Sequence, residues 1–427
     1  MKAYVLLAIA LTACASAAAQ VPCKNHYILA EPCRVDVLRT WRWESAGAMS
    51  TPRRSHAATL LEDGRVLVVG GIGESDSATI PNYLASAEIY DPATNRWSPV
   101  PDMTIRRALP VTIRLRDGRV LATGDIGTWQ EDFVITGIAE AYDPATGRWS
   151  GAGRMITPRV GHTMTLLDDG TVLVAGGLDQ YDMPVGAEIY DPVANRWEIA
   201  PPMRTLRFGH TATRLPDGSV LVAGGSDDDF YGAAIAGAER YDPVQREWLD
   251  ASQLSAARYH HTATLLPDGE VLVVGGYNHV PSRDPRSFTT YYIPTSFAVA
   301  ERFGSSGWSV EAPLNFARTQ HAAAPLPGGM VLVSGGGRWT GAAMSYFPIS
   351  SGTAEVYDPV TASWLMVPDS SANRSQHTAT ALPDGRVLIV GGEDLGTPPY
   401  NFALLGSAEI YGPPKIPTSM GFARQRR

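Results

Sequence analysis

Short apolar runs alternate with polar turns along nearly the whole chain, and one order of runs and turns returns seven times at intervals of about 50 residues. The runs are rich in Val and Leu and are bounded by Gly, Asp and Pro, which predicts β-strands. A fixed internal period of this length predicts a modular all-β architecture made of similar units.

Each copy predicts four strands. In the first copy, Asp63-Gly64 separates two apolar runs, and this dipeptide predicts a tight hairpin because both central residues need positive φ. The run Val66–Val69 then ends at a Gly pair, as expected for a buried strand. After a loop of variable length, a third run ends in Glu-x-Tyr-Asp-Pro and a fourth carries Trp97. Four antiparallel strands per copy make one propeller blade, so we predict a seven-bladed β-propeller.

Several residue types recur once per copy. The arginine series is Arg53, Arg107, Arg159, Arg207, Arg258, Arg318 and Arg374. A histidine follows three residues later in every copy except the second, which has Pro110. The third strands carry Glu88, Glu140, Glu188, Glu239, Glu301, Glu355 and Glu409. A residue that every blade repeats is expected to serve the fold, with Glu as the partner of Arg. The Arg and the His, three apart on one strand, should face opposite sides of it.

The last copy lacks one element. It runs to Glu409 and Tyr411 but has no Trp after them, whereas an unmatched Trp43 precedes the first copy in the correct register. We therefore predict that the N-terminal strand around residues 39–44 closes the seventh blade, which removes exposed sheet edges.

The spacing of the Gly pair, Glu-x-Tyr-Asp-Pro and Trp resembles the kelch repeat over residues 39–413, and the wording Asp-Gly-Arg-Val-Leu-Val-x-Gly-Gly resembles bacterial kelch proteins and the propeller of the galactose-oxidase group. The latter resemblance implies a copper radical site made of a Cys–Tyr crosslink, a second Tyr and two His. The propeller segment contains no Cys, so we expect no copper cofactor. With no zinc, calcium or phosphate-loop motif in the chain, we expect no metal and no other cofactor.

Composition and the N-terminus bear on location. The chain has 427 residues, a net charge of −8 and no basic cluster outside its C-terminal tail (residues 414–427), so we expect no nucleic-acid partner. Residues 1–19 resemble an export signal, either with ordinary cleavage or with a lipobox ending at Cys14 that would anchor the protein to a membrane. In the segment 20–38, Cys23 and Cys33 are expected to form a disulfide in an oxidising compartment. We expect a secreted or periplasmic monomer.

Function is expected where the copies differ, in the loops after the Gly pairs. These loops are rich in aromatic and charged residues, which suit a sugar or an extended peptide. The second blade departs most from the repeat. The predicted ligand-binding residues are Arg107, Asp125, Trp129, Asp132, Tyr181, Tyr231 and Trp339. We predict a binding protein for carbohydrate or protein, with no mapped catalytic residue. A metal-independent carbohydrate isomerase or lyase and a structural envelope component are the alternatives; some bacterial kelch propellers act on sialic acids.

Overall fold

The computed structural model describes residues 38, 40–75, 81–124, 127–129, 132–227, 234–283, 290–339, 348–396 and 402–414. Of residues 127–133 and 282–292 it describes no side chain. The chain divides into two compact units, Trp43–Tyr411 and a unit of the flanking segments Met1–Arg42 and Gly412–Arg427. No helix in the described ranges is long and apolar enough to cross a membrane.

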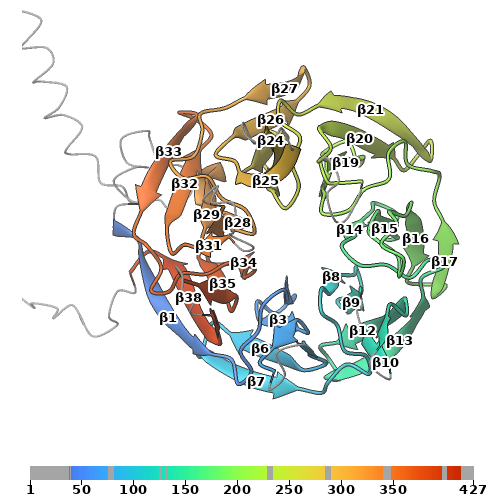
Figure 1. The fold of residues 1–427 in the computed structure, drawn as a ribbon. Helices are drawn as coiled ribbons and strands as arrows, with labels where there is room; N and C mark the ends of the chain where they lie inside the picture. The colour runs from blue at the N-terminus through green and yellow to red at the C-terminus, as the bar shows by residue number, and fades with distance from the viewer. Residues whose placement is uncertain are drawn as a thin grey trace, which may run out of the picture. The chain divides into compact units, whose positions relative to one another are not determined.

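The described part of the unit Trp43–Tyr411 contains seven four-stranded antiparallel sheets, which stand around a central axis as the blades of a propeller (Figure 1). Blade 1 consists of β2 (Ala57–Leu60), β3 (Val66–Val69), β6 (Ala87–Asp91) and β7 (Arg96–Val100). Blade 2 consists of β8 (Val111–Arg114), β9 (Val120–Thr123), β12 (Ile138–Asp143) and β13 (Arg148–Arg154). Blade 3 consists of β14 (Thr163–Leu166), β15 (Val172–Ala175), β16 (Glu188–Asp191) and β17 (Arg196–Ile199). Blade 4 consists of β18 (Thr211–Arg214), β19 (Val220–Ala223), β20 (Gly237–Asp242) and β21 (Glu247–Gln253). Blade 5 consists of β22 (Thr262–Leu265), β23 (Val271–Val274), β26 (Ala300–Gly304) and β27 (Gly307–Val310). Blade 6 consists of β28 (Ala322–Pro325), β29 (Val331–Ser334), β32 (Ala354–Asp358) and β33 (Ser363–Val367). Blade 7 consists of β34 (Thr378–Ala381), β35 (Val387–Val390), β38 (Ser407–Gly412) and β1 (Arg42–Ala48).

One face of the ring carries the connections between the second and third strands of the blades; we call it the loop face. Five of these connections begin as small two-stranded ribbons: β4 (Ile72–Gly73) with β5 (Asn82–Tyr83), β10 (Gly127–Trp129) with β11 (Asp132–Val134), β24 (Tyr277–Arg283) with β25 (Thr290–Ser296), β30 (Gly337–Arg338) with β31 (Ile349–Ser350), and β36 (Glu393–Leu395) with β37 (Phe402–Leu404). On the opposite face, Asp-Gly turns join the first two strands, and in blade 6 the 3-10 turn η1 (Pro327–Gly329) takes their place. The prediction that both residues of an Asp-Gly turn have positive φ was wrong, because only the Gly does, as Gly64 shows with φ of 86°. The Leu61 amide donates to the Arg65 carbonyl at 2.8 Å, so Glu62 belongs to the turn as well.

The predicted closure of the ring by the N-terminal strand is confirmed. β1 is the outer strand of blade 7, next to β38. Trp43 packs on Tyr411 with ring centroids 5.1 Å apart, as Trp97 packs on Tyr90 in blade 1 at 5.1 Å. The Trp43 indole donates to the Pro368 carbonyl of blade 6 at 2.7 Å, and every other repeat Trp makes the equivalent bond to the preceding blade.

The recurring Arg and Glu pair within each blade, as predicted. Arg53 lies 3.2 Å from Glu88, with side chains 0% and 3% exposed, and its guanidinium also donates to the Gly70 and Ser86 carbonyls. The other pairs are Arg107–Glu140, Arg159–Glu188, Arg207–Glu239, Arg258–Glu301, Arg318–Glu355 and Arg374–Glu409. Burial of the guanidinium lowers the pKa of Arg159, and its ion pair with Glu188 opposes that shift. Because each pair is fully enclosed, it stabilises its blade only while both partners are present.

The recurring His binds the preceding blade. The imidazole Nε2 of His210 lies 3.0 Å from the Thr163 hydroxyl, which begins β14. Where the first strand has no Thr at this place, its pairing partner in the second strand supplies the hydroxyl: Thr123 for His162, and Ser334 for His377. Blade 1 has Ala57 paired with Val69 and offers no hydroxyl there. Its neighbour is blade 2, the blade with Pro110, so this departure from the repeat is explained by packing between blades.

These buried imidazoles make stability depend on pH. Desolvation lowers the pKa of His210 from 6.5 to about 3, so the unfolded chain binds a proton between these values that the folded chain does not. This contribution to stability is present above pH 6.5 and is lost as pH falls toward about 3. The free energy of unfolding should decrease less steeply with falling pH in His210→Asn than in the wild type. The difference in slope should reach up to about 1.4 kcal/mol per pH unit. Urea unfolding of both proteins at constant ionic strength measures this; equal slopes would refute the buried neutral imidazole.

Candidate ligand site at the centre of the loop face

Six residues, one just before each repeat His, form a ring around the central axis, which we call the cavity ring. All six have a left-handed backbone, with φ between 51° and 65°: Ser55, Gly161, Gly209, His260, Gln320 and Gln376. Their backbones are joined from blade to blade; the Ser55 amide donates to the Gln376 carbonyl at 3.0 Å, and the Gln376 amide to the Gln320 carbonyl at 3.0 Å. Blade 2 contributes Leu109 and Pro110 at this level.

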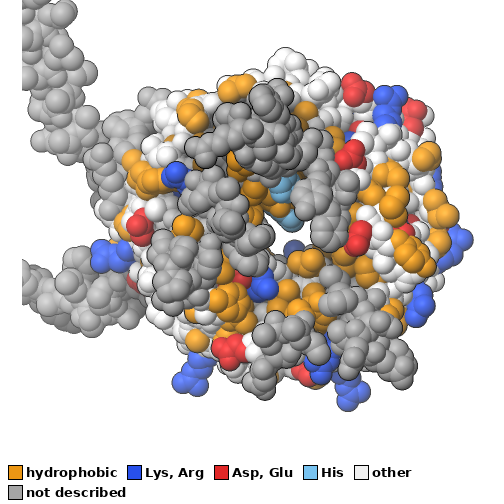
Figure 2. Space-filling model, viewed as in Figure 1, with side chains coloured by type: hydrophobic (Ala, Val, Ile, Leu, Met, Phe, Trp, Pro, Cys, Tyr) orange, Lys and Arg blue, Asp and Glu red, His pale blue; other side chains and the backbone are white. Residues whose placement is uncertain are grey.

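The cavity ring surrounds a hollow of ≈ 530 Å³ that opens on the loop face. Figure 2 shows this opening, with histidine side chains on its wall. The described residues that line it are Ser55, His56, Ile72, Tyr83, Ala108, Leu109, Pro110, Val111, Gly161, His260, Gln320, His321, Gln376 and His377. None of these is an acidic residue, a Lys or an Arg. Desolvation lowers the pKa of His260 to about 4, so its imidazole is neutral at pH 7 as well.

Backbone strain singles out four members of the cavity ring. A left-handed conformation costs a residue with a Cβ about 1–2 kcal/mol relative to glycine. Gly161 and Gly209 show that glycine fits this place in the repeat, yet Ser55, His260, Gln320 and Gln376 occupy it in four other blades. Backbone strain of this kind is typical of functional positions. The side chains of these four residues are therefore the strongest candidates for contact with a ligand.

A polar network reaches the cavity from the interface of blades 7 and 1. The Gln376 amide donates to Glu393 at 2.6 Å, and Arg54 pairs with the same carboxylate at 3.1 Å. The Ser55 hydroxyl donates to the amide oxygen of Gln376. Glu393 is 1% exposed, and burial raises the pKa of its carboxyl while Arg54 opposes the shift. The network holds the Gln376 side chain in one orientation at the cavity wall.

An aromatic cluster stands on the other side of the cavity, on blades 5 and 6. His260 lies parallel to Tyr277, with centroids 6.0 Å apart, and Tyr277 is 4.1 Å from Tyr259. The Tyr259 hydroxyl is 3.2 Å from Nδ1 of His279. Trp339 adds a further ring at 6.0 Å from Tyr277. Aromatic faces next to fixed polar groups are the usual composition of a site for a small amphipathic ligand.

The predicted site residues are spread over different environments. Trp339 belongs to the aromatic cluster, whereas Tyr181 is 74% exposed on blade 3 and has no ring contact with another described residue. Arg107 is 0% exposed and bonded to Glu140, so any ligand would have to displace this pair to reach it. The backbones of Trp129 and Asp132 lie in the ribbon β10–β11, with their side chains outside the described part. Asp125, Tyr231, Cys23 and Cys33 lie outside the described residues, and their assignments stay predictions.

The copper site that the galactose-oxidase resemblance implies does not fit these residues. Two Tyr and two His do meet in the aromatic cluster, but Tyr259 and His279 are bonded to each other. The Cys needed for the crosslink is missing, because no Cys follows residue 33. Among the described residues no group of three or more His, Cys, Asp or Glu is placed to hold a metal ion.

Comparison with known proteins agrees with the repeat. A model of the kelch motif matches residues 53–104. Human Kelch-like protein 34 is 30% identical over 142 residues, which are 32% of this chain and 21% of the human protein. An F-box/kelch-repeat protein of Arabidopsis thaliana is 28% identical over 127 residues, 26% of this chain and 25% of the plant protein. This chain thus spans about a fifth to a quarter of the length of these relatives.

Two solved structures share the fold. A fungal alcohol oxidase of the AA5 family, in complex with copper, superposes with a TM-score of 0.68 at 19% identity, covering 88% of this chain and 77% of its own. The protein YjhT superposes with a TM-score of 0.56 at 13% identity, covering 75% of this chain and 99% of its own. These two likenesses show the fold alone. The kelch-motif match and the kelch-like relatives, together with the seven repeated sheets closed by β1, identify the chain as a propeller of kelch repeats.

Proposed function

We propose that this protein is an exported carbohydrate-binding protein whose ligand enters the cavity ring from the loop face. The observation that carries the proposal is the retention of Ser55, His260, Gln320 and Gln376 in a strained backbone around a hollow of ≈ 530 Å³. Hydroxyl, amide and neutral imidazole groups match the donors and acceptors of sugar hydroxyls, and the ring of Tyr83 among the lining residues matches the apolar face of a pyranose. The absence of charge among the described lining residues favours a neutral sugar.

A second function, a metal-independent carbohydrate isomerase or lyase, is favoured by one observation. Glu393 is a buried carboxyl next to the cavity wall, and burial raises its pKa while Arg54 opposes the shift, which makes it a candidate for proton transfer. The two functions separate in one experiment: an isomerase or lyase converts the bound sugar, as seen by proton NMR of the sugar over time, and a binding protein leaves it unchanged. Export, by cleavage after the signal or by a lipid on Cys14, and the monomeric state remain parts of the proposal.

The substitution Gln320→Gly tests the proposal against a purely structural role. Glycine removes the left-handed strain at this place, so we expect an unfolding free energy that is unchanged or higher by up to about 1 kcal/mol. Loss of the amide should weaken sugar binding about tenfold. A glycan array with the mature protein identifies the sugar, and calorimetry with that sugar gives the affinity. The control Asp169→Ala, in an Asp-Gly turn on the opposite face, should keep the wild-type affinity. Wild-type affinity in Gln320→Gly would refute the assignment of the cavity ring.

A further inference from the structure

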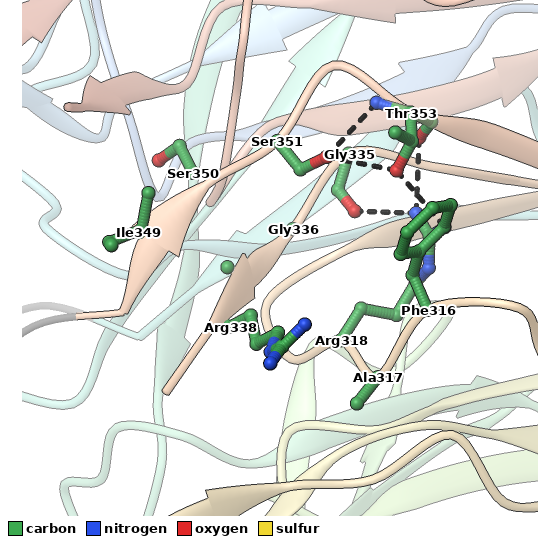
Figure 3. A pocket seen from close by; sticks show the side chains of 11 residues that line it. Phe316, Ala317, Arg318, Gly335, Gly336, Arg338, Ile349, Ser350, Ser351 and Thr353 are labelled. Atoms are coloured by element: carbon green, nitrogen blue, oxygen red, sulfur yellow. Dashed lines mark hydrogen bonds between the residues drawn. The ribbon is translucent and has the colours of Figure 1, made fainter. Parts of the chain in front are cut away.

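Blade 6 has a second pocket on the loop face, of ≈ 400 Å³, set apart from the cavity ring. Figure 3 shows it, with Arg318 and Phe316 on one side, Ser350 and Ser351 on another, and Arg338 nearby. The guanidinium of Arg318 donates to the Gly335 carbonyl at 2.7 Å and to Glu355 at 2.7 Å, as in the other blades. The pocket therefore lies over a group that every blade contains.

The pocket exists because blade 6 breaks the repeat at one place. In each described blade but the second, the amide of one residue donates to the carbonyl of the second Gly of the pair. These residues are Leu84, Val185, Ile235, Phe297, Ser351 and Leu405. Five have bulky apolar side chains, and only Ser351 is small and polar. The residue after the Gly pair, Gly337, adds no space, because a Cβ there would lie 2.6 Å from Pro348. The small side chain of Ser351 therefore accounts for the hollow.

Blade 5 shows which group fits such a hollow. Phe297 is its residue equivalent to Ser351, and the Arg258 guanidinium lies over the Phe297 ring, 5.8 Å from the centroid. This distance is within the range of a cation–π contact. Arg318 of blade 6 is bonded to two carbonyls and a Glu that are equivalent to those around Arg258 of blade 5. The space above Arg318 therefore has the chemistry to accept an aromatic ring from outside.

The charge next to the pocket adds a second element of recognition. Arg338 is exposed and makes no ion pair with any residue that the structure describes. We propose that the blade 6 pocket anchors an aromatic side chain of a protein partner, stacked on Arg318, while Arg338 pairs with an acidic residue adjacent to that side chain in the partner. This site is independent of the sugar proposed for the cavity ring.

The probe is the dipeptide N-acetyl-Asp-4-fluoro-Phe-amide, followed by fluorine NMR with the full mature protein. We expect the fluorine signal to broaden with the wild type and to sharpen again when excess N-acetyl-Asp-Phe-amide competes. Ser351→Leu introduces the side chain that blades 1 and 7 have at this place, but removes the hydroxyl that accepts the Thr353 amide at 3.1 Å. The variant should therefore fold with a somewhat lower melting temperature. It should bind the probe at least about tenfold more weakly.

Arg338→Gln separates the two elements of the site. This variant should weaken binding of the Asp-containing probe several-fold, and should leave binding of the analogue with Asn in place of Asp unchanged. Absence of broadening with the wild type would overturn the proposal. Equal binding by wild type and a folded Ser351→Leu would overturn it too, because the dipeptide would then sit elsewhere. Sugar binding in the cavity ring should be the same in wild type and Ser351→Leu, so failure of one site does not imply failure of the other.

Discussion

Glu188→Leu will lower the free energy of unfolding by about 3–5 kcal/mol, because it leaves the Arg159 guanidinium buried without its counter-charge. The two side chains are each 1% exposed, so water cannot replace the lost carboxylate. The Glu188 carboxylate also accepts hydrogen bonds from the backbone amides of Ile156 at 2.7 Å and Thr157 at 2.9 Å, and both amides would lose their acceptor. Urea unfolding followed by tryptophan fluorescence measures the change.

Two comparisons show whether burial of the pair is the cause. Arg159→Met combined with Glu188→Leu removes both charges, and should be less destabilising than Glu188→Leu alone. Arg196→Ala breaks a pair with Glu198 whose side chains are 70% and 35% exposed, and should change stability by less than about 1 kcal/mol. A Glu188→Leu protein as stable as the wild type would contradict a structural role for the Arg–Glu series.

Loss of the closing strand has the second large effect. A mature chain that starts after Ala48 lacks β1, so β38 becomes an unpaired edge and the Trp43 indole leaves Tyr411. Replacing the indole alone, in Trp43→Ala, should cost about 3 kcal/mol, the lower end for large aromatic truncations because the side chain is only half-buried. We expect the truncated chain to lose cooperative unfolding and to aggregate, as followed by calorimetry and light scattering.

Trp43→Phe provides the matched control. It keeps an aromatic ring on Tyr411 but removes the indole N–H that donates to Pro368. Its free energy of unfolding should therefore lie between those of the wild type and Trp43→Ala. A truncated chain with the melting temperature of the intact one would show that the ring does not depend on β1.

The repeat made most of the fold predictable. Strand order, the place of Trp43 in blade 7 and the Arg–Glu pairs all follow from positions that recur once per copy, and each was confirmed. The places of the Asp-Gly turns were also predictable, but their backbone conformation was not. A residue that recurs once per copy predicts structure because every blade must pair equivalent buried polar groups and pack on its neighbours in an equivalent way.

The candidate site was predictable only in part. The loop face followed from the order of the strands, and Trp339 lies in the aromatic cluster there. The cavity ring was missed, although one signal was present: the residue before the repeat His is Gly in two copies and Ser, His or Gln in four. Its meaning depends on φ, which no spacing reveals. Pro110 of blade 2 could not be explained from the sequence, because the hydroxyl that is missing in blade 1 faces it only across the blade interface. The loop residues of blade 2 stay predictions.

The contact of Arg54 with Glu393 was invisible for a similar reason. These residues come from the first and the last blade, and only closure of the ring brings them within 3.1 Å. The hollow at Ser351 could not be predicted either, because the loops of blades 5 and 6 differ in length and sequence and cannot be aligned residue by residue. Only the equivalent hydrogen bonds, Ser351 to Gly336 and Phe297 to Gly276, show that Ser351 takes the place of Phe297.

A crystal structure of the mature protein with the sugar identified on the glycan array tests the central claim most directly. We expect the sugar to lie inside the cavity ring, with its hydroxyls within hydrogen-bond distance of at least two of Ser55, His260, Gln320 and Gln376. A sugar bound on the opposite face, among the Asp-Gly turns, or on the loops with no contact to these four residues, would contradict it.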